Sequence, residues 1–326
     1  MAANLKGNSV KKPVLAVING GGCRQIECAT GILQALDAAG IRIDRYTGSS
    51  AGAAVAALHA SGNDGETLEL LIRVTPAREL FRPCWIHQAL SLFGVTVDHI
   101  FDASGMYRML LENITGAARS NVRVAVTRLR DYASMMCDAT PETVMASAAI
   151  PEVFPPVEIQ GEKFVDGGVK NMIPTPKISE IGDYEHIYIL LCNDDAPGPK
   201  PKTRIGRGIE AFSRTMDRET CQLYEEGWHE LPNVTVIQPP PFPSSLLDWS
   251  EDYKLIEHAR NYAATCLRRP GALRPPVPQT GKVPAPGTVS SFLLRKNLKT
   301  GGSIYQFICS VGDICHRPPE TPRFQS

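Results

Sequence analysis

Ser50 lies in the pentapeptide Gly48-Ser49-Ser50-Ala51-Gly52, which is a G-x-S-x-G pattern. In a nucleophile elbow, this pattern places a serine on a sharp turn between a strand and a helix, where the glycines permit a crowded backbone. The first amides of the following helix then point towards the negative charge that develops during acyl transfer. The pattern favours a nucleophilic serine, and its plainer interpretation is a turn beside a closely packed helix.

A second glycine-rich turn, Gly20-Gly21-Gly22, is followed by Cys23 and Arg24. Consecutive glycines between a strand and a helix leave backbone amides that can converge on an anion. A nucleotide phosphate is the rival ligand, but the run matches neither G-x-G-x-x-G nor G-x-x-x-x-G-K-[ST]. We therefore expect this turn to stabilise the oxyanion of an acyl-transfer reaction.

A serine nucleophile needs a base, and Asp166 has the most suitable setting. It begins the sequence Asp166-Gly167-Gly168, directly after the strand-like residues Lys163 to Val165. A serine triad would instead take its base from one of three later histidines, which are His186, His229 and His258. None of these follows a strand at a glycine-rich turn, so a Ser-Asp dyad is favoured. An ordinary Asp-Gly turn is the plainer interpretation of Asp166.

Alternating strands and helices must position these turns. Val14 to Ile18 predicts a buried strand, and residues 26 to 39 repeat apolar side chains at helical spacing up to a stop at Gly40. Ile41 to Thr47 predicts a second strand, and Ala51 to Ala60 a small-residue helix. Four further strands are expected at 122–126, 163–165, 186–191 and 234–237. This order predicts an α/β fold with a mainly parallel central sheet flanked by helices, in which both glycine turns lie at carboxyl ends of strands and face one crevice.

The composition excludes several classes of protein. The 326 residues are 43% hydrophobic, and 34 basic residues balance 34 acidic ones, so a disordered chain is not expected. A formal net charge of zero argues against a nucleic-acid partner. No stretch approaches the apolar length of a bilayer-spanning helix. Residues 1–12 lack the apolar core of a secretory leader, and the nine cysteines contain no C-x-x-C pair, so we expect a cytoplasmic protein.

The three motifs, in this order, resemble those of the patatin-like phospholipase family. The family has a G-G-G-x-[RK]-G oxyanion loop, a G-x-S-x-G elbow and a D-G-[GA] motif. The segments Ala146 to Pro151 and Phe154 to Pro156 are similar to the family segment before the aspartate, and Val169, Asn171 and Pro174 to its continuation. The resemblance is specific from Val14 to Pro174 and departs from the pattern at Gln25, where the family has glycine. This departure puts the geometry of helix entry in question.

The resemblance implies a patatin-like α/β/α sandwich and a lipid acyl hydrolase of the phospholipase A or lysophospholipase type. Ser50 would be the nucleophile and Asp166 its base, and no cofactor or metal would take part. The implied oxyanion donors are the amides of Gly20, Gly21, Gly22 and Ala51. Arg24 matches the basic position of the loop and would steady it or contact a phosphate-bearing headgroup, while a solvated charge is the equal alternative. The substrate would be a phospholipid or another fatty-acyl ester, met at a membrane surface.

Two other functions stay open on the sequence. One is a His-dependent α/β-hydrolase esterase, which is disfavoured because Ser50 follows only about two strands. The other is a catalytically silent lipid-binding scaffold, which Gln25 weakly favours. We expect a lead at 1–13, a catalytic domain at 14–268 and a proline-rich extension at 269–326, and we assign no activator or oligomeric state.

Three further patterns concern membrane contact, an acyl pocket and metal binding. A membrane contact is one interpretation of the basic run made of Lys200, Lys202, Arg204 and Arg207. An acyl pocket or lid is one interpretation of the apolar stretch from Leu90 to Val97. Cys309, Cys315 and His316 lack a convincing zinc spacing, so no metal is assigned to them.

Overall fold

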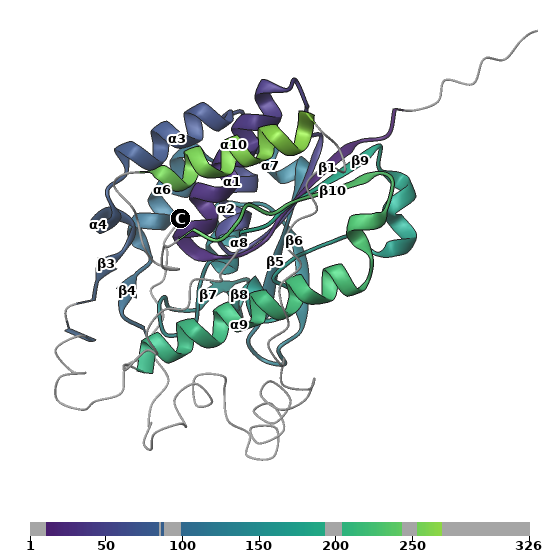
Figure 1. Ribbon diagram of the computed structural model, residues 1–326. Helices are drawn as coiled ribbons and strands as arrows, with labels where there is room; N and C mark the ends of the chain where they lie inside the picture. The colour runs from purple at the N-terminus through teal and green to yellow at the C-terminus, as the bar shows by residue number, and fades with distance from the viewer. Residues whose placement is uncertain (1–10, 85, 88–98, 193–203, 243–252, 269–326) are drawn as a thin grey trace, which may run out of the picture.

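The fold is a central sheet with helices on both sides, seen in a computed structural model that describes residues 11–84, 86–87, 99–192, 204–242 and 253–268 (Figure 1). The main sheet has eight strands, and seven of them follow the order β10-β9-β1-β2-β5-β8-β7, while β6 pairs with β5. Its strands are β1 (Val14–Ile18), β2 (Arg45–Ser49), β5 (Val122–Arg128), β6 (Ser134–Asp138), β7 (Val157–Ile159), β8 (Glu162–Asp166), β9 (His186–Leu190) and β10 (Val234–Ile237). A separate two-stranded sheet pairs β3 (Arg82–Pro83) with β4 (Phe101–Asp102).

Helices cover both faces of the sheet. Figure 1 shows α1 (Gly22–Ala38), α3 (Gly65–Val74) and α10 (Lys254–Arg268) on one side and α9 (Arg204–Glu225) on the other. The remaining α-helices are α2 (Ala51–Ala60), α4 (Ala77–Leu80), α6 (Ser104–Asn113), α7 (Gly116–Asn121) and α8 (Pro141–Ser147). The 3₁₀ turns are η1 (Gly167–Val169), η2 (Ile178–Asp183) and η3 (Trp228–Glu230). The prediction of an α/β fold with a mainly parallel sheet flanked by helices is confirmed.

The register between β1 and β2 places the two glycine-rich turns at the same height along the strands. Strands β10, β9, β1, β2 and β5 all run parallel, and Ile18 of β1 pairs with Gly48 of β2. Ser49 of β2 in turn pairs with Ala125 of β5. Because β1 and β2 are adjacent and parallel, the residues after both strands emerge at the same edge of the sheet. This confirms the expectation that both glycine turns lie at carboxyl ends of strands.

The strand that carries Asp166 runs the other way. β8 is antiparallel to β5, and Asp166 pairs with Val126, one residue beyond the Ala125 that pairs with Ser49. β8 therefore starts beside the end of β5 and runs back along it. Its last residue, Asp166, lies at the level of Ser50. The alternation of strands and helices did not predict the reversed direction of β8. It also did not predict β6 and β7, because these two strands are short and carry polar residues.

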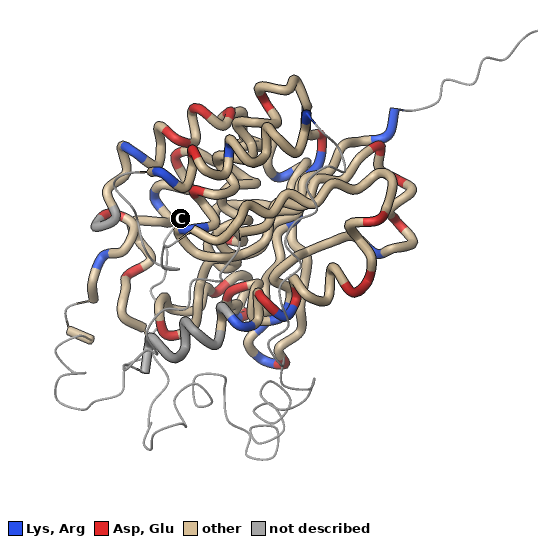
Figure 2. Tube along the Cα trace, in the orientation of Figure 1, with Lys and Arg blue, Asp and Glu red and all other residues tan. Residues whose placement is uncertain are grey.

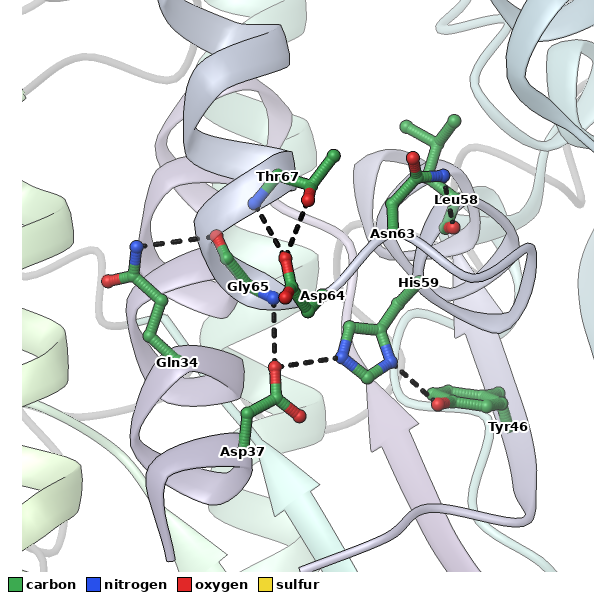
Figure 3. Close-up of polar contacts among 9 residues, drawn as sticks. All are labelled: Gln34, Asp37, Tyr46, Leu58, His59, Asn63, Asp64, Gly65 and Thr67. Carbon is green, nitrogen blue, oxygen red and sulfur yellow. Dashed lines mark hydrogen bonds and ion pairs between the residues drawn. The ribbon is translucent and has the colours of Figure 1, made fainter. Parts of the chain in front are cut away.

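A polar network fixes the corner between β2 and the helices around α1 (Figure 3). The Tyr46 hydroxyl lies 2.6 Å from His59 Nδ1, and His59 Nε2 lies 3.4 Å from Asp37 Oδ2. The same Asp37 oxygen accepts a hydrogen bond from the Gly65 amide at 2.8 Å, at the start of α3. Residues from β2, α2, α1 and α3 are thus tied together by hydrogen bonds.

Two predicted elements have different boundaries in the structure. Helix α1 begins four residues earlier than the expected 26, and the second strand lies later, at Arg45–Ser49 rather than 41–47. The strands expected at 122–126, 163–165, 186–191 and 234–237 are confirmed. The proline-rich extension at 269–326 lies outside the described residues, as do Leu90 to Val97, Lys200 and Lys202; Arg204 and Arg207 lie in α9, without described side chains.

The described residues show no segregation of charge and no helix suited to crossing a membrane. Figure 2 shows basic and acidic residues interspersed along the described chain rather than gathered on a face of one sign. Among the described helices, none combines the length and apolar character needed to cross a membrane.

Candidate active site

The elbow around Ser50 is a strained turn that glycine makes possible. Ser50 has φ 52° and ψ −128°, a backbone conformation that costs energy for a residue with a Cβ. A Cβ on Gly48 would lie 2.6 Å from the Gly52 carbonyl oxygen, and a Cβ on Gly52 would lie 2.3 Å from the Asn19 carbonyl oxygen. Both glycines of the pattern are therefore required, because α2 starts in direct contact with β2 and with the end of β1.

Ser50 and Asp166 form a buried hydrogen-bonded pair. Ser50 Oγ donates to Asp166 Oδ2 at 2.6 Å, and the two residues are 1% and 0% exposed. The other carboxylate oxygen, Oδ1, accepts the Gly168 amide at 2.7 Å. Since each carboxylate oxygen has its own donor, the carboxylate is held in one orientation with one oxygen directed at the serine.

Burial changes the acidity of Asp166. Desolvation raises the pKa of its carboxyl to about 7, although the hydrogen bonds from the Ser50 hydroxyl and the Gly168 amide each act to lower it. A carboxylate with a pKa near neutrality is a better proton acceptor than one with the usual value near 4, and it is still ionised in a large fraction of molecules at neutral pH. The pair has the properties of a nucleophile and its base.

The glycine turn after β1 leads directly into α1. Gly22 adopts φ 62°, a left-handed conformation that favours glycine, and α1 starts at this residue. The Gly20 amide, however, donates to the Met172 carbonyl at 3.0 Å. This requires a revision of the expected donor set, because an amide engaged in the loop's own structure is not offered to a substrate. The amides of Gly21 and Gly22 enter the first turn of α1, where no acceptor within the helix is available.

Arg24 and Gln25 lie inside the protein. Arg24 is 1% exposed, so the alternative of a solvated charge is wrong, and it is absent from the lining of the pocket described below. Its setting agrees with a role in steadying the loop rather than with a headgroup contact. Gln25 is fully buried, and its Nε2 donates to the Leu190 carbonyl at 3.4 Å. Helix entry is intact with glutamine at this position, because the preceding glycines make the turn.

Two supporting residues were not found from the sequence. The hydroxyl of Ser147, at the end of α8, accepts the Ser50 amide at 2.9 Å and is fully buried. Glu219 of α9 accepts the amides of Met172 and Ile173 at 2.7 and 3.1 Å, and burial raises the pKa of its carboxyl. Glu219 thereby holds the same Met172 whose carbonyl anchors Gly20. The resemblance of residues 146–151 to the family segment pointed to the region of Ser147 but not to its role. Nothing in the sequence distinguishes Glu219 from any other acidic residue in a helix.

We expect Ser147→Ala to weaken the elbow. The change leaves the buried amide of Ser50 without its acceptor, which costs about 1–3 kcal/mol of stability and loosens a residue already in a strained conformation. Denaturant unfolding measures the first effect, and kcat for an ester substrate measures the second. Ser147→Thr, which keeps the hydroxyl, should recover most of both. Equal behaviour of the two variants would show that the hydroxyl does not support Ser50.

The three histidines of the alternative triad lie elsewhere. His186 begins β9, where it pairs in register with Val14 at the start of β1, so it occupies the opposite edge of the sheet from Ser50. Its Nε2 lies 2.8 Å from Thr235 Oγ1. His229 contacts Glu230, and His258 Nε2 lies 3.2 Å from the Pro240 carbonyl. In the described part of the chain, Ser50 Oγ is paired with a carboxylate and not with an imidazole.

Ser50 lines an apolar pocket that is partly open to solvent. Ser50, Ala54 and Leu58 lie along one face of α2 and line it, together with Gly22 and Ala51. The other lining residues come mainly from α1, α3 and α6 and from the segments around α4 and Phe154: Cys23, Ile26, Thr30, Val55, Leu68, Leu71, Ile72, Thr75, Leu80, Phe81, Met106, Met109, Ala148, Ile150 and Phe154. The starts of α1 and α2 thus border the same cavity as the serine.

Residues 16–177 match the family model described as patatin-like phospholipase. The chain therefore carries a patatin-like phospholipase domain. The matched range includes all three motifs, from the glycine turn after β1 to the residues that follow Asp166. The resemblance seen in the sequence is confirmed.

Proteins from two mycobacteria are similar to this chain. Two proteins named "Uncharacterized NTE family protein", from Mycobacterium bovis and Mycobacterium tuberculosis, are each 28% identical to this chain over 242 residues. The match covers 69% of this chain and 61% of each relative, so the chain spans about three fifths of their length. Among solved structures, VipD from Legionella pneumophila is similar, with a TM-score of 0.40 and 13% identity over 78% of this chain and 67% of VipD.

Proposed function

We propose that this protein is a lipid acyl hydrolase of the phospholipase A or lysophospholipase type that works through Ser50 and Asp166. The observation that carries the proposal is the 2.6 Å hydrogen bond to a buried carboxylate from the Oγ of Ser50, a residue that lines an apolar pocket. A hydrocarbon chain bound along this apolar lining would have its ester carbonyl beside the serine. Membership of the domain in the patatin-like phospholipases supports the same substrate class.

The proposed reaction has two steps. Asp166 takes the hydroxyl proton as Ser50 Oγ attacks the ester carbonyl, and the tetrahedral intermediate expels the alcohol or lysolipid, which receives the proton from Asp166. A water molecule then attacks the acyl-enzyme, gives a proton to Asp166 and releases the fatty acid as the proton returns to Ser50 Oγ. Both steps use one base, and neither calls for a cofactor.

The amides of Gly21, Gly22 and Ala51 are the proposed oxyanion donors. They belong to the first turns of α1 and α2, where amides have no acceptor within the helix and the helix dipole is positive. Gly22 and Ala51 line the same pocket as Ser50. Two helix starts facing one serine give the positive potential that a developing oxyanion requires.

The pocket predicts a preference for long acyl chains. Ser50, Ala54 and Leu58 extend along roughly 12 Å of the α2 axis, so an acyl chain lying there passes Ala54. Ala54→Phe should block this path. If about four methylenes lose their burial, kcat/KM for a long-chain ester falls about a hundred-fold, while a butanoyl ester is much less affected.

The measurement is the ratio of kcat/KM for hexadecanoyl and butanoyl esters. Leu70→Phe is the matched control, because Leu70 is 59% exposed on α3 and does not line the pocket. A ratio that stays at the wild-type value in Ala54→Phe, with both esters still hydrolysed, would mean that the acyl chain binds elsewhere.

Fluorophosphonate labelling separates this proposal from a silent lipid-binding scaffold. A scaffold with the same fold has no activated serine, whereas the proposed nucleophile should form a covalent adduct that peptide mapping assigns to Ser50. The His-dependent esterase has a separate test: a large loss of activity on replacing His186, His229 or His258 would favour it.

A further inference from the structure

A cysteine and two histidines come together beside the small β3–β4 sheet. Cys84, His87 and His99 each offer one ligand atom, and these atoms lie within 4.8 Å of one another. All three side chains are partly exposed, so an ion can reach them from solvent. Ligands around one tetrahedral zinc ion, at about 2.3 Å for sulfur and 2.0–2.1 Å for nitrogen, lie roughly 3–4 Å apart, so only a small closure is needed.

The hydrogen bonding of His87 suits a metal ligand. His87 Nδ1 lies 3.0 Å from the His99 carbonyl oxygen, and because a carbonyl can only accept, Nδ1 carries the proton. In that tautomer, the lone pair is on Nε2, the nitrogen through which His87 would bind a metal. Histidines that bind metals generally donate the other ring N–H to a carbonyl or carboxylate, which fixes the ring. The His87 and His99 rings pack edge to face with centroids 4.4 Å apart, so the two imidazoles lie side by side.

The backbone also holds the cluster together. Arg82 pairs with Asp102, Pro83 pairs with Phe101, and the Cys84 amide donates to the Ile100 carbonyl at 2.9 Å. Cys84 and His99 are therefore neighbours at the end of the β3–β4 ladder. A soft thiolate with two imidazoles is a donor set that suits zinc rather than magnesium or calcium.

We propose that Cys84, His87 and His99 form a zinc-binding site with a fourth position left for water or another small ligand. The thiol of Cys84 binds as a thiolate, and its proton passes to solvent when the ion binds. The ion would link residue 84 to residue 99, at the two ends of the intervening segment. Aromatic side chains of β4 and of the residues next to β3 connect this site to the pocket.

The connection runs through aromatic side chains. Phe81 precedes β3 and lines the pocket, and its ring lies 5.5 Å from Phe101 of β4 and 5.8 Å from Phe154, which also lines the pocket. Zinc at the end of the ladder would hold β3 against β4 and thus fix Phe81 in the pocket wall. The proposed dyad chemistry does not depend on this ion.

Cobalt substitution tests the site directly. The purified, metal-free full-length protein is titrated with Co²⁺ and then with Zn²⁺. We expect a thiolate-to-cobalt charge-transfer band and intense visible bands typical of tetrahedral cobalt, both lost when zinc displaces it. Competition with a chromophoric chelator should show that Cys84→Ser, His87→Ala and His99→Ala each weaken zinc binding at least about 100-fold, since even an outer-shell change typically costs 10–100-fold.

The controls are Cys137→Ser and His258→Ala, which remove a thiol and an imidazole outside the cluster. Both should bind zinc as the wild type does. Circular dichroism of each metal-free variant checks folding, and zinc should raise the unfolding temperature of the wild type and both controls but not of Cys84→Ser. Absence of the charge-transfer band in folded wild type, or unchanged zinc affinity in the three cluster variants, would overturn the proposal.

Discussion

Replacing Ser50 by alanine should reduce ester hydrolysis at least about 10³-fold, because the proposed nucleophile is removed while the pocket and the oxyanion donors remain. The loss should be in kcat, with little change in the binding of a non-hydrolysable lipid. Ser50 is buried at a strained turn, and alanine fits the space of the serine. The variant should therefore stay folded.

The neighbouring residue provides a matched control. Ser49 is also fully buried, and its hydroxyl has no hydrogen-bond partner among the described residues. Ser49→Ala removes a hydroxyl one residue away without touching the pair of Ser50 and Asp166, so its kcat should stay within a few-fold of the wild type. A Ser50→Ala protein that keeps a substantial part of its kcat would refute the assignment of the nucleophile.

Asp166→Asn should cause a loss of kcat comparable to that of Ser50→Ala, because the amide cannot accept the serine proton. Wild-type activity should also depend on pH in a defined direction. Asp166 acts as a base only when ionised, and burial raises its pKa to about 7. The rate should therefore increase as pH rises through about 7 and level off above it. A pH profile that is flat between pH 5 and 9 in a folded, active enzyme would contradict this role.

The same substitution should stabilise the fold at neutral and alkaline pH. The pKa of Asp166 is raised from 3.8 to about 7, so between these values the folded state binds more protons than the unfolded state, and stability falls as pH rises through this window. Asparagine is neutral throughout. Asp166→Asn should therefore gain stability over the wild type above pH 7, on the order of a few kcal/mol at most, and lose this advantage near pH 4.

Denaturant unfolding at these two pH values checks the stability effect. Asp183→Asn is the control, because Asp183 is exposed and its neutralisation should change stability little at either pH. A lost activity combined with a gained stability distinguishes a functional carboxylate from a structural one. If Asp166→Asn were inactive and also less stable at pH 8, its carboxylate would have mainly a structural role.

The local motifs of the site could be predicted from the sequence because each is a short run of residues with a fixed spacing. Gly48 and Gly52 are needed for the close approach of α2 to β2 and β1, and this requirement is visible as a fixed spacing. The alternation of strands with helices likewise predicted the parallel half of the sheet. Asp166 was singled out by its own glycine turn.

The rest depends on contacts between segments that are distant in the chain. The antiparallel entry of β8 sets the level at which Asp166 meets Ser50, and nothing in residues 162–166 encodes that direction. The Gly20 amide donates a hydrogen bond to the Met172 carbonyl, and the Met172 amide donates to Glu219, which lies 47 residues further along the chain. Cys84, His87 and His99 have no standard zinc spacing, and only the pairing of β3 with β4 brings them together.

The most direct test of the central claim is a digest of mixed phospholipids and lysophospholipids by the wild type and Ser50→Ala, side by side, read by mass spectrometry. We expect wild type alone to consume particular acyl esters and to release matching amounts of free fatty acid and deacylated lipid. Identical lipid profiles for the two folded proteins, at a pH where Asp166 is ionised, would contradict it.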